Sequence, residues 1–175
     1  SMSMELLTQP WWDKFYDSEE VDRARKSHLE GVVFLLPWIA TIDSFQHWIY
    51  ANPNHSREER AEIWQSIRDR FGSEMDWGGY SDFREVSWQQ QSHLFGVPFY
   101  YIEYGIAQLG SIQLWKTQMS DPEKALDDYA KAMSLGNTKT LPELFSAADL
   151  KLEFSESHFQ TLMSSVEGAL TDAHS

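Results

Sequence analysis

The sequence has no cysteine, few cations and no long run of apolar residues. Without cysteine the chain has no disulfide framework, no thiolate nucleophile and no cysteine-ligated zinc finger. Lysine and arginine number 14 against 27 aspartates and glutamates, which leaves a net charge of −13. Nucleic acids and anionic membranes are bound through clustered cations, so we expect neither as a partner. The longest apolar run, residues 31–40, is shorter than the roughly 20 residues that cross a bilayer.

The amino-terminal residues also lack the basic segment followed by an apolar stretch that marks a secretory signal. We therefore expect a cytoplasmic protein. A length of 175 residues suits one domain, residues 1–175. With 42% apolar and 14% aromatic residues, the chain has enough apolar material to bury a core.

Helical signals recur along the chain, and no stretch alternates as a strand would. Apolar residues at a spacing of three to four predict one long helix over 18–51. Ser56 and Glu59 form a capping box for the next helix, which Gly72 ends. Further helices are predicted over residues 81–94 and 99–119, from 122 towards 136, and after residues 140 and 155. We expect an all-α fold, a multi-helix bundle.

Two groups of side chains outside the central segment invite a functional interpretation. Asp43 and His47 lie one helical turn apart, which is a metal-ligand spacing. No third ligand is evident nearby, so we interpret them as a surface pair and predict no metal site on this chain. A dense aromatic group near the amino terminus is predicted to belong to the core; its members are Trp11, Trp12, Phe15 and Tyr16.

The segment 88–115 holds the most informative residues, which are His93, Tyr100, Tyr101 and Tyr104. On a helix beginning near residue 99, the three tyrosines fall within one arc of about 100°, so their hydroxyls face one way. A phenol can donate to a developing oxyanion, and histidine can donate or accept near neutral pH. The pattern fits a cleft that binds peptide carbonyls. Spacing alone favours the other interpretation, an aromatic core face with locally satisfied hydroxyls.

Residues 85–116, which we call the Tyr-rich segment, have VPFYYIEYGIAQLG (Val97 to Gly110) at their centre. This segment resembles the C-terminal part of the oligoendopeptidase F family of zinc metallopeptidases, relatives of thimet oligopeptidase. Shorter pieces occur in the family's order: His28-Leu29-Glu30, Asp43-Ser44-Phe45-Gln46-His47-Trp48, Phe71-Gly72, Asp121-Pro122-Glu123-Lys124-Ala125-Leu126 and Leu141-Pro142-Glu143-Leu144-Phe145. The resemblance runs from Ser1 to about Phe159.

The resemblance implies an all-α fold with a deep peptide channel. The family holds zinc through two histidines of a His-Glu-x-x-His helix and a glutamate on a later helix, and the motif's glutamate is the general base. This sequence has no such motif, and its first residues resemble the stretch that directly follows the third ligand. We therefore expect the metal residues upstream of Ser1, no zinc on this chain, and no activity of the chain alone.

The resemblance also implies roles on the substrate side. His93 matches a histidine that holds the substrate backbone, and Tyr104 matches the tyrosine that stabilises the oxyanion. Tyr101 and, less closely, Tyr100 match substrate-contacting positions. The expected partners are short peptides and the N-terminal part of the catalytic domain. The alternative is a helical peptide-binding or interaction module without catalysis. A truncated domain exposes apolar surface, so self-association would favour the fragment over the module.

Overall fold

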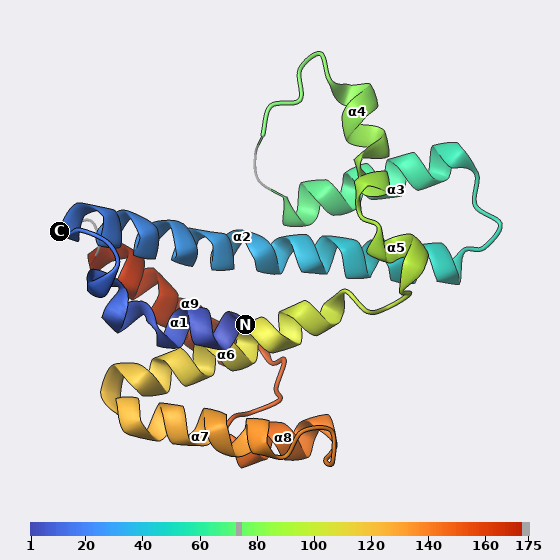
Figure 1. The fold of residues 1–175 in the computed structure, drawn as a ribbon. Helices are drawn as coiled ribbons and strands as arrows, with labels where there is room; N and C mark the ends of the chain where they lie inside the picture. The colour runs from blue at the N-terminus through green and yellow to red at the C-terminus, as the bar shows by residue number, and fades with distance from the viewer. Residues whose placement is uncertain (73–74, 173–175) are drawn as a thin grey trace. The chain divides into compact units, whose positions relative to one another are not determined.

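The chain is built from helices, as the sequence predicts. The computed structural model describes residues 1–72 and 75–172, and no strand occurs among them (Figure 1). In chain order the helices are α1 (Met2–Leu7), the 3-10 helix η1 (Gln9–Lys14), α2 (Ser18–Ala51), α3 (Arg57–Phe71), α4 (Ser81–Val86), the 3-10 helix η2 (Ser87–Gln90), α5 (His93–Gly96), α6 (Ile102–Ser120), α7 (Pro122–Ser134), α8 (Leu141–Ala147) and α9 (Glu156–Asp172). The all-α fold class is confirmed.

These helices form two compact units. Unit 1 comprises Ser1–Val32 together with Ile106–Ser175, and unit 2 comprises Val33–Gly105. The long helices α2 and α6 each contribute residues to both units. That all 175 residues act as one domain stays a prediction.

The core of unit 1 forms where α6 meets α1, α7 and the end of α8. Its buried members are Leu7, Leu114 and Ala125, with Tyr129 and Leu150 packed against them. The buried Gln118 on α6 donates from Nε2 to the carbonyl of Leu7 over 2.5 Å, which ties α1 to α6. At Gly110, a Cβ would lie 3.2 Å from the ring of Phe145, so the absence of a side chain lets α8 approach α6 closely.

A carboxylate on α8, Glu143, and one just after that helix, Asp149, predict that unit 1 loses stability in acid. The Thr140 hydroxyl and backbone N–H both donate to Glu143, and these bonds lower the pKa of that carboxyl. The Lys124 ammonium lies 2.8 Å from Asp149, and its hydrogen bond and charge lower the pKa of Asp149. A carboxyl whose pKa is lowered by folding stabilises the protein above its unfolded pKa and loses that contribution as the pH falls. We expect the free energy of unfolding, measured in urea, to fall as the pH drops through the ordinary values of 4.5 for Glu143 and 3.8 for Asp149.

Asp149→Asn tests this expectation, because the amide keeps the shape and loses the titration. The variant should show a shallower decline in acid than the parent. Asp127→Asn on α7 is the matched control, since the described residues offer Asp127 no ion-pair partner. Parallel acid profiles for Asp149→Asn and the parent would contradict the prediction.

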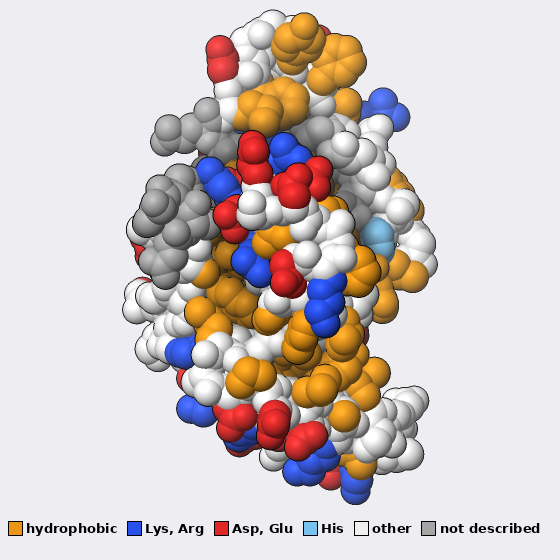
Figure 2. Space-filling view, turned by 60° about the vertical axis from the view of Figure 1, so that its left-hand side comes forward, with side chains coloured by type: hydrophobic (Ala, Val, Ile, Leu, Met, Phe, Trp, Pro, Cys, Tyr) orange, Lys and Arg blue, Asp and Glu red, His pale blue; other side chains and the backbone are white. Residues whose placement is uncertain are grey.

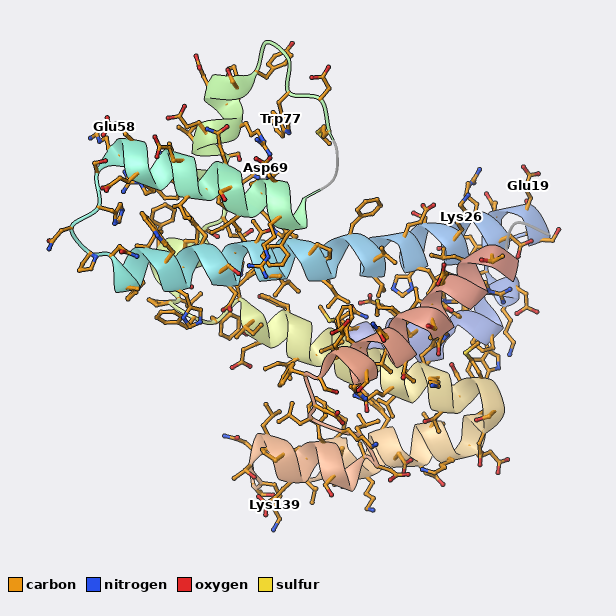
Figure 3. All side chains as sticks on the ribbon, turned by 180° about the vertical axis from the view of Figure 1, so that it is seen from behind. Glu19, Lys26, Glu58, Asp69, Trp77 and Lys139 are labelled. Carbon is orange, nitrogen blue, oxygen red and sulfur yellow. The ribbon has the colours of Figure 1, made fainter. Side chains whose placement is uncertain are left out.

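The core of unit 2 is an aromatic cluster between α2 and α3. Ile42, Phe45 and Trp64 are fully buried in it, and the partly buried side chains around them include Trp38, Trp88, Leu94 and Tyr101. The Arg68 guanidinium on α3 lies over the rings of Trp38, Trp64 and Trp77, at 5.3, 5.7 and 5.7 Å from their centroids. Trp77 comes from the loop before α4, and Asp69 marks the neighbouring turn of α3 (Figure 3). This cation among aromatic faces fastens the loop to α3.

The helix predicted over 81–94 is interrupted, so that prediction is wrong in extent. The chain forms α4, then η2, and then the short α5. The carbonyl of Arg84 accepts from Trp64 Nε1 at 2.9 Å and from the Ser87 hydroxyl at 2.7 Å. In a continuous α-helix that carbonyl would accept from the backbone N–H four residues on. Contacts with α3, distant in sequence, therefore end α4.

The helix predicted from residue 99 begins later, at Ile102. Phe99 has φ of +59°, a left-handed conformation that a bulky residue adopts only under constraint. Its N–H donates to the Oε1 of Gln46, a side chain buried on α2, over 2.8 Å. Its ring contacts those of His47 and Tyr50, with centroids 5.0 and 4.8 Å apart. Tyr100 and Tyr101 thus stand before the helix, and their placement does not come from a helical arc.

The amino-terminal aromatic group is exposed, so the prediction that it belongs to the core is wrong for this chain. Phe15 is 80% exposed, and Trp11 and Tyr16 are also open to solvent. Only Trp12 is half-buried, with its ring centroid 5.8 Å from that of His28. Figure 2 shows one face on which hydrophobic side chains lie open among charged ones. Trp11 and Trp12 lie on the short 3-10 helix η1, and Phe15 and Tyr16 directly follow it.

Helix α2 is long and apolar enough to cross a membrane by length and composition, which its short apolar run had not led us to expect. Core helices meet the same criterion. In unit 2, α2 buries Ile39, Ile42 and Phe45. The apolar residues of α2 are thus explained by their packing in the core of unit 2.

Candidate active site

The structure brings the four predicted site residues together in unit 2. His93 lies on α5, Tyr104 on the first turn of α6, and Tyr100 and Tyr101 on the turn between them. The centroid of the His93 ring is 5.0 Å from that of Tyr101, 5.7 Å from that of Tyr104 and 6.4 Å from that of Tyr100. The Tyr100 ring is nearly parallel to the imidazole, at 7°, and the other two meet it edge-on.

A chain of hydrogen bonds runs through His93. Trp38 Nε1 donates to Gln91 Oε1 over 3.2 Å, and Gln91 Nε2 lies 2.6 Å from His93 Nδ1. His93 Nε2 lies 3.3 Å from the Tyr104 hydroxyl. The imidazole is thus held at both nitrogens, which orients its ring between α2 and the start of α6.

Tyr101 and Tyr104 are half-buried. Burial raises the pKa of Tyr101, and hydrogen bonding with Trp38 and Gln91 acts in the opposite direction. The net upward shift keeps the phenol neutral and protonated at neutral pH. Tyr100 is 45% exposed, so the cluster combines two half-buried phenols with one that is open to solvent. A ligand that approaches this surface meets neutral hydrogen-bond donors on aromatic rings.

Sequence reasoning missed Trp38 and Gln91. Gln91 stands in the Tyr-rich segment that carries the resemblance, two residues before His93, and this proximity was a signal that could have been used. Trp38 gave none, because it lies on α2, far from His93 in sequence, and reaches the site only through the packing of unit 2.

Asp43 and His47 form a pair on α2, as predicted. Asp43 Oδ2 lies 3.6 Å from His47 Nε2, and two-thirds of the His47 side chain is exposed. Across residues 1–72 and 75–172, no group of three or more histidine, aspartate or glutamate side chains is placed to hold a metal. These residues therefore do not fit a zinc site, and we derive no chemical step through zinc from them.

The profile of peptidase family M3 matches residues 1–164. The chain belongs to this family. The resemblance on the Tyr-rich segment is thereby confirmed, and the family implies a metallopeptidase-type hydrolase. A comparison with curated proteins gave no match.

Solved structures of M3 peptidases share the fold of the chain. PZ peptidase A, solved with inhibitor 2, is 34% identical at a TM-score of 0.91, covering 98% of this chain and 31% of that one. A protein assigned as oligoendopeptidase F is 32% identical at a TM-score of 0.85, covering 98% of this chain and 30% of that one. Another, from Bacillus anthracis str. Ames, is 30% identical at 0.78, covering all of this chain and 28% of that one. The chain thus spans under a third of the length of these M3 structures.

Proposed function

We propose that this M3 chain supplies the substrate-binding and oxyanion-stabilising side of the cleft of a zinc-dependent oligoendopeptidase that hydrolyses short peptides. One observation carries the proposal: the hydrogen-bonded pair of His93 and Tyr104, flanked by Tyr100 and Tyr101. Neutral donors grouped at a partly open surface suit the carbonyl groups of a peptide.

Each side chain has a distinct part in this proposal. The Tyr104 hydroxyl donates to the oxygen that becomes negatively charged when the scissile carbonyl turns tetrahedral. His93 holds the substrate backbone next to that carbonyl. Tyr101 and Tyr100 contact the peptide on either side of the imidazole. None of the three phenols adds a charge, so each binds the polar backbone without attracting a counterion.

The zinc ligands belong, in this proposal, to other sequence of a longer protein. Two observations support that part: the described residues offer no group of three ligands, and the M3 structures are more than three times as long as the matched segment. A cytoplasmic location is part of the same proposal, in line with the absence of cysteine.

We expect the chain alone to hold no stoichiometric zinc and to hydrolyse no peptide. Native mass spectrometry after incubation with zinc measures the first, and a fluorogenic peptide assay with and without chelator measures the second. The complete product of the gene's reading frame should hydrolyse the same peptide in a chelator-sensitive manner. One bound zinc per chain that Asp43→Asn abolishes, or chelator-sensitive hydrolysis by the chain alone, would overturn the proposal. A complete product that binds peptides and never cleaves them would instead favour an interaction module.

A further inference from the structure

The Gln91 side chain lies between the Trp38 indole, which can only donate a hydrogen bond, and the His93 imidazole, which can donate or accept one. The indole N–H of Trp38 has no acceptor capacity, so the Gln91 atom 3.2 Å from it must be the carbonyl oxygen. That choice leaves the amide nitrogen of Gln91 facing His93 Nδ1, at 2.6 Å. Trp38 therefore decides which way the Gln91 amide points.

The Gln91 amide in turn decides where the imidazole carries its proton. An amide nitrogen donates and cannot accept, so His93 Nδ1 must be the bare nitrogen of a neutral ring. The ring proton then sits on Nε2, which points at the Tyr104 oxygen 3.3 Å away. The second partner of a histidine commonly sets its tautomer in this way.

The tautomer has a consequence for Tyr104. When His93 Nε2 donates, the Tyr104 oxygen accepts, and the phenolic proton stays available for another acceptor. In the opposite tautomer, Nε2 would carry no proton and would accept a hydrogen bond from the Tyr104 hydroxyl. The hydroxyl would then have no donor left for a substrate oxygen.

We propose that Gln91, oriented by Trp38, is a positioning residue that holds His93 in the Nε2–H tautomer and so keeps the Tyr104 hydroxyl free to donate. This inference rests on the proposed function for the use of that donor. The tautomer itself is a property of the chain that can be measured without any peptide.

Nitrogen-15 spectra of the histidine rings in the purified chain test the inference directly. At a pH above the titration of the imidazoles, the long-range proton–nitrogen pattern separates the two neutral tautomers. We expect His93, assigned by comparison with His93→Gln, to be predominantly Nε2–H. A predominantly Nδ1–H ring, or an even mixture, would overturn the proposal.

Gln91→Glu reverses the donor facing His93. A carboxylate in place of the amide accepts from Nδ1–H, so the ring should switch to the Nδ1–H tautomer. Gln90→Glu is the matched control, because Gln90 is the exposed neighbour and the change adds the same charge. It should leave the His93 pattern unchanged. An Nε2–H ring in Gln91→Glu, with backbone amide spectra like those of the control, would refute the role of Gln91.

Gln91→Met covers the case in which Gln91→Glu does not fold. Methionine removes the donor without adding a charge, and we expect the Nε2–H preference to weaken to a mixture. An undiminished Nε2–H preference in this variant would mean that Gln91 does not select the tautomer. In the complete peptidase, Gln91→Glu should lower kcat by about 10²–10³, the loss of one oxyanion donor. If Tyr104→Phe leaves kcat intact while the tautomer is as expected, the proposed function fails and the inference about Gln91 stands.

Discussion

Tyr104→Phe is expected to lower kcat of the complete peptidase by about 10²–10³ and to leave KM nearly unchanged. The substitution removes one oxygen and keeps the ring, which meets the rings of His93, Tyr100 and Tyr101 edge-on. An oxyanion exists only in the transition state and the intermediate, so its donor contributes little to ground-state binding. Steady-state kinetics on a single fluorogenic peptide measures both constants.

Tyr129→Phe is the matched control for this experiment. Tyr129 is a partly buried tyrosine of unit 1 that packs against the cluster of Leu7, Leu114 and Ala125. Its substitution removes the same oxygen far from His93 in sequence and should leave kcat and KM unchanged. A Tyr104→Phe enzyme with unchanged kcat would show that Tyr104 is a core aromatic residue with no catalytic part.

Trp64→Ala is expected to cost unit 2 about 3–5 kcal/mol of unfolding free energy, as large aromatic truncations in cores do. Trp64 is fully buried, with the ring of Phe45 4.9 Å away and that of Trp38 6.1 Å away. The truncation also leaves the Arg84 carbonyl without its indole donor. A loss of this size is a large fraction of the stability of a small protein, so we expect unit 2 of this variant to unfold at a much lower denaturant concentration.

Two further variants serve as comparisons for the loss of unfolding free energy in Trp64→Ala. Trp64→Phe keeps a six-membered ring and removes the N–H together with part of the indole, so it should cost less than Trp64→Ala, about 1–3 kcal/mol. Trp11→Ala removes an exposed tryptophan and should change the free energy by no more than about 0.5 kcal/mol. Denaturant unfolding followed by fluorescence and circular dichroism measures all three. Equal stabilities for Trp64→Ala and Trp11→Ala would contradict the central place of Trp64 in unit 2.

The helix boundaries that depend on local chemistry were predictable. The capping box of Ser56 and Glu59 is present with both of its hydrogen bonds, and Asp121 caps α7 through the N–H of Lys124. These interactions join residues three apart, so a pattern in the sequence is enough to identify them. The break after α4 was not predictable, because the Trp64 indole that donates to the Arg84 carbonyl lies 20 residues away on α3.

The candidate site was predicted in its membership and not in its geometry. The resemblance named His93, Tyr100, Tyr101 and Tyr104, and the structure places their rings in contact. The helical arc invoked for the three tyrosines was wrong, because only Tyr104 lies on α6. Phe99 has a left-handed conformation and donates its N–H to Gln46, and the two tyrosines that follow it lie before α6 with their rings next to that of His93. The roles of the four side chains stay predictions until kinetics tests them.

The amino-acid sequence alone was enough to establish an all-α protein of the M3 peptidase family and the short segment that carries its histidine and tyrosines. Hydrophobic periodicity, helix caps and a distinctive segment each involve residues that are close in sequence, so they can be identified from the sequence alone. Only the tertiary structure decided what surrounds the imidazole. Trp38 and Gln91 are 53 residues apart, and the bond between them depends on the packing of α2 in unit 2. Proton placement on His93 follows from that bond, because hydrogen-bond direction is set by which atoms meet in space.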